Sequence, residues 1–171
     1  INTPNALHSL TTLSIYKIGT HLSQENDQQT LALRSGSRGC LLHIQQYGDA
    51  FVHSELVNAN YTGVLVIAIS TASGHGEEED EEIYNGLNCI FWFLSNLNKG
   101  NKGTYSFPPQ PLLAQRSDEQ IEEEGGNEEI DSLQKYKGFY GNIKNEANRA
   151  KQMIMNYFIK RGNPKPDWYY Q

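Results

Sequence analysis

The feature that most constrains this fold is the unbroken apolar run Val64–Ile69, which lies between Gly63 and Ser70. The run has no polar face, so the element that it forms must be buried on every side. Its valine and isoleucine content and the flanking glycine favour a central β-strand. A short buried helix is the alternative, because it would have the same composition.

The part of the chain before this run is also typical of strands, since its apolar and β-branched residues come in short segments. These segments are Thr11–Ile18, Thr30–Arg34, Cys40–Tyr47 and Ala50–Val57. The last two are separated by Gly48-Asp49, and a two-residue loop that begins with glycine indicates a tight hairpin. We therefore expect a mainly antiparallel sheet of four or five strands over about residues 11–70.

The second half of the chain predicts two amphipathic helices, at about residues 80–98 and 139–160, because apolar residues recur there every three or four positions. The first helix is expected to end at Lys99-Gly100. Residues 99–132 contain several prolines and eight acidic side chains, which is typical of a long acidic loop. With 171 residues, the chain is expected to be a single α+β domain in which the helices cover one face of the sheet.

This order of elements over residues 11–98 resembles that of the longin, roadblock and profilin-like families of small adaptor domains. The resemblance is in element order and carries no shared motif. It implies an adaptor that contacts other proteins.

Charge is distributed unevenly along the chain, with a net charge of −11 in residues 77–132 and +6 in residues 133–171. The whole chain has a net charge of −6 and a pI near 5.3, which argues against a nucleic-acid partner. No apolar run approaches the roughly 20 residues of a membrane-spanning helix, so we expect no membrane span. Ile1 at the start suggests processing or a cut from a longer chain.

Weak candidates for catalysis follow the apolar run, in the turn that holds Ser70, Ser73 and His75. A histidine between two glycines is accessible enough to act as a general base. The stretch Gly74-His75-Gly76-Glu77-Glu78 resembles the histidine segment of caspase-like proteases. That family also needs a nucleophilic cysteine on a later strand, whereas Cys89 follows only 14 residues later, in a predicted helix. We therefore interpret the turn as a solvated connection.

The sequence predicts no metal site and no cofactor. The five histidines show none of the spacings of known metal sites. The acidic runs Glu77–Glu82 and Glu122–Glu124 are sequential, which is typical of a solvated surface. Residues 35–39 are predicted to form a turn or bulge, and beside Arg34 and Arg38 such a turn could present backbone N–H groups to an anion.

The two cysteines, Cys40 and Cys89, lie in apolar segments and are expected to be buried free thiols. Free thiols suggest an intracellular, reducing compartment, with a single disulfide as the alternative.

The aromatic tail, residues 163–171, ends in Trp168, Tyr169 and Tyr170, which either fold back or bind a partner. We therefore expect a non-catalytic protein–protein interaction subunit or adaptor within a larger assembly, whose partner is another protein or a second copy. One alternative is a small hydrolase-like or ligand-binding domain that uses the Ser70–His75 turn. The other is a viral or other self-assembling structural protein.

Overall fold

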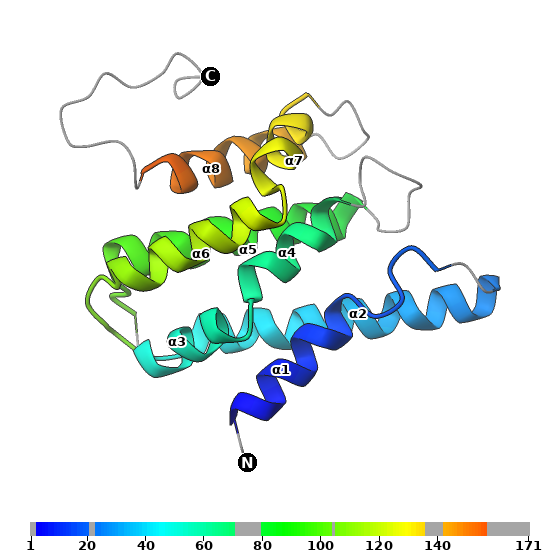
Figure 1. Ribbon diagram of the computed structural model, residues 1–171, viewed down its shortest axis with the longest axis horizontal. Coiled ribbons are helices and arrows are strands. Elements are labelled where there is room, and N and C mark those ends of the chain that lie inside the picture. Colours follow the sequence, from blue (N-terminus) through cyan, green and yellow to red (C-terminus); the bar gives the residue numbers. More distant parts are fainter. Residues whose placement is uncertain (1–2, 21–22, 71–79, 104, 136–141, 157–171) are drawn as a thin grey trace.

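The computed structural model describes residues 3–20, 23–70, 80–103, 105–135 and 142–156. Within these ranges the chain forms eight helices and no strand, and one isolated backbone bridge joins Asn101 to Phe107. Figure 1 shows the arrangement of the helices. They are α1 (Thr3–Ser14), α2 (Gln24–Tyr47), α3 (Ala50–Asn58), α4 (Tyr61–Ser70), α5 (Asp80–Lys99), α6 (Pro111–Glu123), α7 (Gly126–Leu133) and α8 (Ile143–Asn156).

The predicted α+β fold is therefore wrong for the described part of the chain. Residues 11–70, where four or five antiparallel strands were expected, belong mainly to helices α1 to α4. The resemblance to longin, roadblock and profilin-like domains fails with the sheet, since it rested on the order of strands and helix.

The apolar run that favoured a central strand is instead the central helix. In α4, eight of the ten residues are buried. It packs against α1, α3, α5, α6 and α7, so every side of this short helix meets another helix. A helix that is apolar all round is stable only when it is enclosed in this way. The prediction of a strand failed because complete burial removes the alternation that distinguishes the two kinds of element.

The predicted hairpin at Gly48-Asp49 is a joint between two helices. Gly48 follows the last residue of α2, and Asp49 caps the N-terminus of α3, where its Oδ1 accepts a hydrogen bond from the Val52 amide at 3.0 Å. A Cβ at position 48 would lie 2.6 Å from Val52 Cγ1 and 2.7 Å from the Ile44 carbonyl oxygen, so only glycine fits between the two helices. Glycine and aspartate are favoured at helix ends as well as in hairpin loops.

The two predicted helices are present. The first, expected over about 80–98, is α5. The range expected for the second, 139–160, includes α8. Residues 139–141 and 157–160 of that range lie outside the described residues. The acidic loop expected over 99–132 is wrong in large part, because it contains α6 and most of α7. Pro111 is the first residue of α6, a position where proline costs a helix no hydrogen bond.

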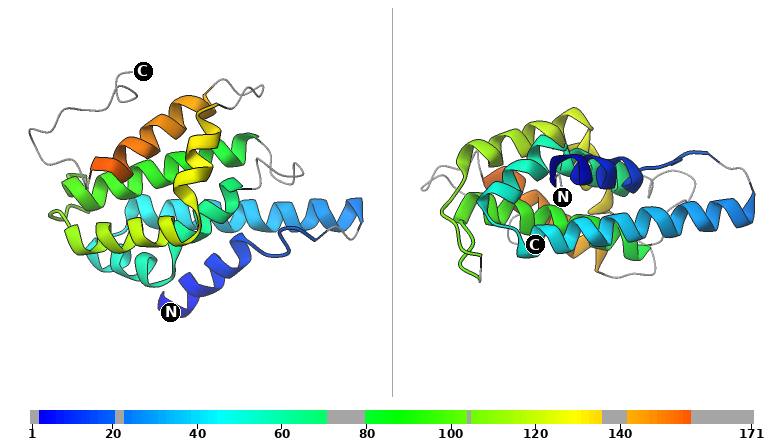
Figure 2. Two further views of the ribbon diagram at one scale, coloured as in Figure 1. Left: turned by 45° about the horizontal axis from the view of Figure 1, so that its top comes forward. Right: turned by 90° about the horizontal axis from the view of Figure 1, so that it is seen from below.

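One cluster of buried hydrophobic residues draws on all eight helices. Two of the close contacts between helices in this cluster depend on glycine. A Cβ at Gly86 of α5 would lie 2.7 Å from Ile69 Cγ2, and one at Gly126 of α7 would lie 2.8 Å from Val66 Cγ2. Both glycines therefore let a neighbouring helix approach α4. The longest helix, α2, extends past the rest of the bundle in both views of Figure 2.

Candidate functional site

An apolar groove of about 430 Å³ lies where α1, the end of α2 and the start of α3 meet. We call it the α1–α3 groove. Its lining residues are Ala6, Leu7, His43, Ile44, Tyr47, Gly48 and Val52. The groove follows from two local features, which are the packing of α1 against α2 and the sharp joint at Gly48 that brings α3 alongside.

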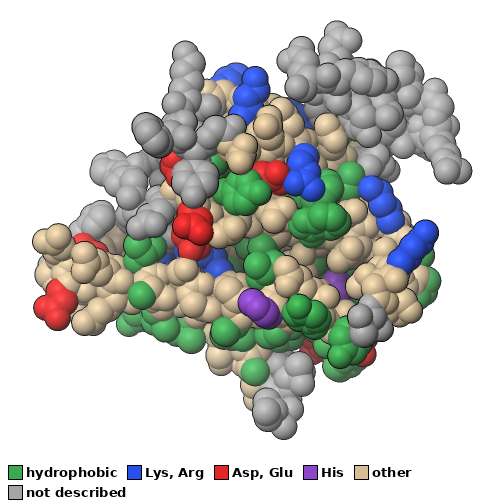
Figure 3. Space-filling model, turned by 180° about the vertical axis from the view of Figure 1, so that it is seen from behind, with side chains coloured by type: hydrophobic (Ala, Val, Ile, Leu, Met, Phe, Trp, Pro, Cys, Tyr) green, Lys and Arg blue, Asp and Glu red, His purple; other side chains and the backbone are tan. Residues whose placement is uncertain are grey.

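One exposed aromatic ring lines this groove, and a second exposed ring lies on α3. Tyr47, in its lining, is 63% exposed, and Phe51, next to the lining residue Val52, is 62% exposed. Each exposed ring offers an apolar surface whose burial favours a contact. Figure 3 shows hydrophobic side chains along the lower part of the molecule, where α1, α2 and α3 lie.

The surroundings of the groove are almost free of charge. Helix α1 contains no Asp, Glu, Lys or Arg, and neither does the last part of α2, residues 39–47. The acidic side chains of residues 118–131 lie on α6 and α7, away from α1 (Figure 1). The α1–α3 groove therefore has uncharged walls from α1 and the end of α2, while α3 carries Asp49 at its N-terminal cap and Glu55.

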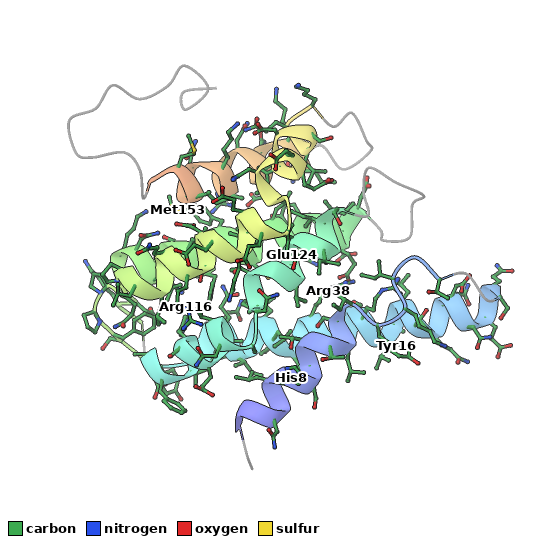
Figure 4. The ribbon with its side chains drawn as sticks, viewed as in Figure 1. His8, Tyr16, Arg38, Arg116, Glu124 and Met153 are labelled. Carbon is green, nitrogen blue, oxygen red and sulfur yellow. The ribbon has the colours of Figure 1, made fainter. Side chains whose placement is uncertain are left out.

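A second, smaller pocket of about 100 Å³ lies between α2 and α5, and its polar side is an ion pair. Arg38 donates to Glu82 through Nε at 3.0 Å, and Ser35 Oγ donates to the other carboxylate oxygen at 2.5 Å. Arg38 also donates to the carbonyl of Ser14, at the end of α1, at 3.1 Å. Figure 4 places Arg38 between α2 and the layer that contains α4. This cluster therefore ties α1, α2 and α5 together.

The turn or bulge predicted at residues 35–39 is wrong, and the anion site considered there depended on it. These residues lie inside α2, so their N–H groups point along the helix rather than toward a ligand. Arg38 is paired with Glu82, and Arg34 donates to the carbonyl of Tyr16 at 3.3 Å. Arg38 thus binds the last carbonyl of α1, where helix carbonyl groups carry partial negative charge, and Arg34 binds the turn that follows α1.

The two cysteines are both free, and they differ in environment. Cys89 lies at the smaller pocket, and burial raises the pKa of its thiol to about 11. It is therefore protonated at neutral pH and is a poor nucleophile. Cys40 is exposed, which corrects the expectation that both thiols are buried.

The predicted site residues are only partly described. Ser70 is the last residue of α4, and its hydroxyl donates to the carbonyl of Ile67 at 2.8 Å. Ser73 and His75 lie outside the described residues, as do Trp168, Tyr169 and Tyr170. Within the described ranges, the His, Cys, Asp and Glu side chains form no group of three or more that could hold a metal ion.

His53 and Asp118 are further buried titratable groups of the bundle. His53 is stacked on Phe93 at 5.4 Å between ring centroids, and its Nδ1 donates to the carbonyl of Asp49 at 2.9 Å. Burial lowers the pKa of His53, so its ring is neutral near pH 7. Burial also raises the pKa of Asp118 to about 7, with a smaller contribution from Glu119.

The groove residues are the ones that the sequence interpretation missed, because residues 40–47 and 50–57 were taken as the strands of a hairpin. The available signal was the helical spacing of His43 and Tyr47 within a stretch that lacks charge. In the described part of the chain, no helix combines the length and apolar character that crossing a membrane requires. Comparison with known protein families, with curated proteins and with solved structures finds no match for this chain.

Proposed function

We propose that this chain is a non-catalytic interaction module that binds an apolar segment of a protein in the α1–α3 groove. The observation that carries the proposal is the groove itself, an apolar hollow of about 430 Å³ whose lining includes the exposed ring of Tyr47. Aromatic residues next to an apolar hollow are typical of the centres of protein interfaces.

The chemistry of the groove favours one kind of ligand, an amphipathic helix with an uncharged apolar face. Such a helix places side chains at positions i, i+3 or i+4 and i+7 into a groove between other helices. The wall contributed by α1 has no charged side chain to pair with a charged ligand. Affinity must therefore come from the burial of apolar surface.

The experiment is a selection of helical peptides from a displayed library against the folded chain. We expect the selected peptides to carry apolar residues at helical spacing. Because Ala6 lines the groove, Ala6→Glu should weaken their binding by at least about tenfold, which corresponds to about 1.4 kcal/mol.

The matched control is Ala32→Glu, the same substitution at an exposed position of α2 outside the groove, which should leave binding unchanged. Circular dichroism of both variants verifies that the helices remain. Peptides that bind the wild type and Ala6→Glu equally well would contradict the proposal.

The alternative of a hydrolase-like site at Ser70–His75 stays a prediction, since Ser73 and His75 lie outside the described residues. The expected intracellular, reducing location also stays a prediction.

A further inference from the structure

We infer that His53 makes the α1–α3 groove sensitive to acid: when its buried ring takes up a proton, the first turn of α3 opens and the groove loses that wall. The inference rests on the proposed function and names its regulation. Two residues that line the groove, Gly48 and Val52, lie next to this turn and in it. A movement of the turn therefore changes the shape of the groove.

The ring of His53 is enclosed by two aromatic rings. It stacks on Phe93 of α5, with 5.4 Å between the ring centroids, and lies 4.7 Å from the ring centroid of Phe107, in the segment between α5 and α6. His53 has no exposed surface, and Phe107 is 7% exposed. The ring can therefore meet water only if the turn that carries it moves.

The two nitrogens of this ring differ in their partners. Nδ1 donates to the carbonyl oxygen of Asp49 at 2.9 Å, so the neutral ring carries its lone pair on Nε2. Nε2 is buried and has no hydrogen-bond partner among the residues that the structure describes. A proton on Nε2 would place a positive charge and an N–H group in an apolar site without an acceptor. The protonated ring is therefore favoured only where water can solvate it.

The ring is tied to the turn through Asp49. The backbone N–H of His53 and its Nδ1 both donate to the Asp49 carbonyl, at 3.0 Å and 2.9 Å. The side chain of Asp49 accepts from the Val52 amide at 3.0 Å. Two of these three hydrogen bonds belong to His53, so moving its ring into solvent weakens the turn at the residue that closes it.

The charges around His53 do not compensate a proton on its ring. Helices α1 and α4 and residues 39–47 of α2 have no Asp, Glu, Lys or Arg, and α5 and the segment after it present the two uncharged rings described above. Arg116 of α6 donates to the last residue of α3, at the far end of that helix. Among the described groups, the Asp49 carboxylate is the charge that raises the pKa of His53. Burial lowers this pKa and is the larger effect, so the pKa lies below its usual value of 6.5.

Hydrogen exchange measures the opening of the turn without any peptide. The reporters are the amides of Val52 and His53, which donate to Asp49. As pH falls below 6.5, the open turn binds a proton that the closed turn does not, so opening becomes up to about tenfold more favourable per pH unit. The exchange rates of both amides, divided by the chemical rate of exchange at each pH, should rise by that factor in the wild type.

The variants replace the histidine by groups that cannot take up a proton. His53→Phe keeps a ring between Phe93 and Phe107, and His53→Asn is a smaller substitute that keeps a donor beside the Asp49 carbonyl. Both should give corrected exchange rates that do not change between about pH 5 and pH 8. The matched control is His43→Asn, which removes an exposed histidine from the lining of the same groove and should keep the wild-type dependence.

The outcomes separate this inference from the proposed function. Corrected rates that are constant with pH in the wild type, or that depend on pH equally in His53→Phe, overturn the acid sensitivity. Peptides selected at neutral pH that bind the groove would then still support the proposed function. An equal rise at the amides of α8 also overturns the inference, because the whole bundle would be unfolding. Opening that acid promotes and both His53 variants abolish supports it, even where the selection of peptides fails.

Discussion

Asp118 is a carboxyl group buried in the bundle. It lies on the buried face of α6, beside Ser117 and in line with Ala114 and Ile121. Both carboxylate oxygens are buried and have no hydrogen-bond partner in the described part of the chain. The charged form therefore loses its hydration without compensation, which is why the pKa rises to about 7.

This shift predicts how stability depends on pH. Between about pH 4 and pH 7 the folded chain holds a proton on Asp118 that the unfolded chain has released. The contribution of Asp118 to the free energy of unfolding is thus most favourable below pH 4, decreases as pH rises, and is lost above pH 7. Asp118→Asn removes this dependence and should be more stable than the wild type above pH 7, by on the order of 2–4 kcal/mol.

Urea unfolding of the wild type and Asp118→Asn at a series of pH values measures the effect. The difference between the two proteins is the quantity to follow, because it cancels the opposite contribution of His53, whose lowered pKa costs stability as pH falls below 6.5. Glu123→Gln, at an exposed position of the same helix, should give a difference near zero. A difference for Asp118→Asn that stays constant from pH 4 to pH 8 would show that Asp118 is solvated.

At the scale of single elements, the sequence predicted the helices that have one buried face. Ile83, Leu87 and Ile90 of α5 are fully buried at spacings of three and four, and this periodicity located the helix to within a residue or two. Helix α4 is buried on all sides and has no such periodicity. Gly48-Asp49 is equally suited to a hairpin loop and to two helix ends, so the local sequence could not distinguish the folds.

The α1–α3 groove could not be predicted from the sequence for a related reason. It depends on how α1 crosses α2 and on the joint between α2 and α3, which no local pattern encodes. The candidate residues at the Ser70–His75 turn and in the aromatic tail were chosen for their chemistry. Of these residues, the structure describes only Ser70, at the end of α4.

The contact between α4 and α5 makes a prediction at this scale. Alanine in place of a helical glycine normally stabilises a protein by about 0.5–1 kcal/mol. Gly86→Ala should instead destabilise the chain by about 1–3 kcal/mol, because its Cβ would lie 2.7 Å from Ile69 Cγ2. Gly36→Ala is the matched control, since a Cβ there meets no described atom within 4 Å.

Thermal unfolding followed by circular dichroism measures both variants. We expect Gly36→Ala to raise the melting temperature and Gly86→Ala to lower it. Equal increases in both would mean that α5 does not approach α4 as closely as the structure shows.

At the scale of the whole molecule, the helices fall into two groups around α4. Helices α1, α2 and α3 lie on one side and carry the apolar groove, and α6, α7 and α8 lie on the other (Figure 1). Helix α4 contacts members of both groups, and so it joins them into a single core. The groove lies in the first group and the acidic side chains of α6 and α7 lie in the second, which is why we assign docking to the first group.

Hydrogen–deuterium exchange of the chain with and without a peptide selected for groove binding tests this assignment most directly. The expected result is slower exchange with peptide in residues 5–14 and 40–58, which span most of α1, the end of α2 and α3, with exchange in α6, α7 and α8 unchanged. Slower exchange confined to α6, α7 or α8 would contradict the account, because the contact surface would then lie away from the α1–α3 groove.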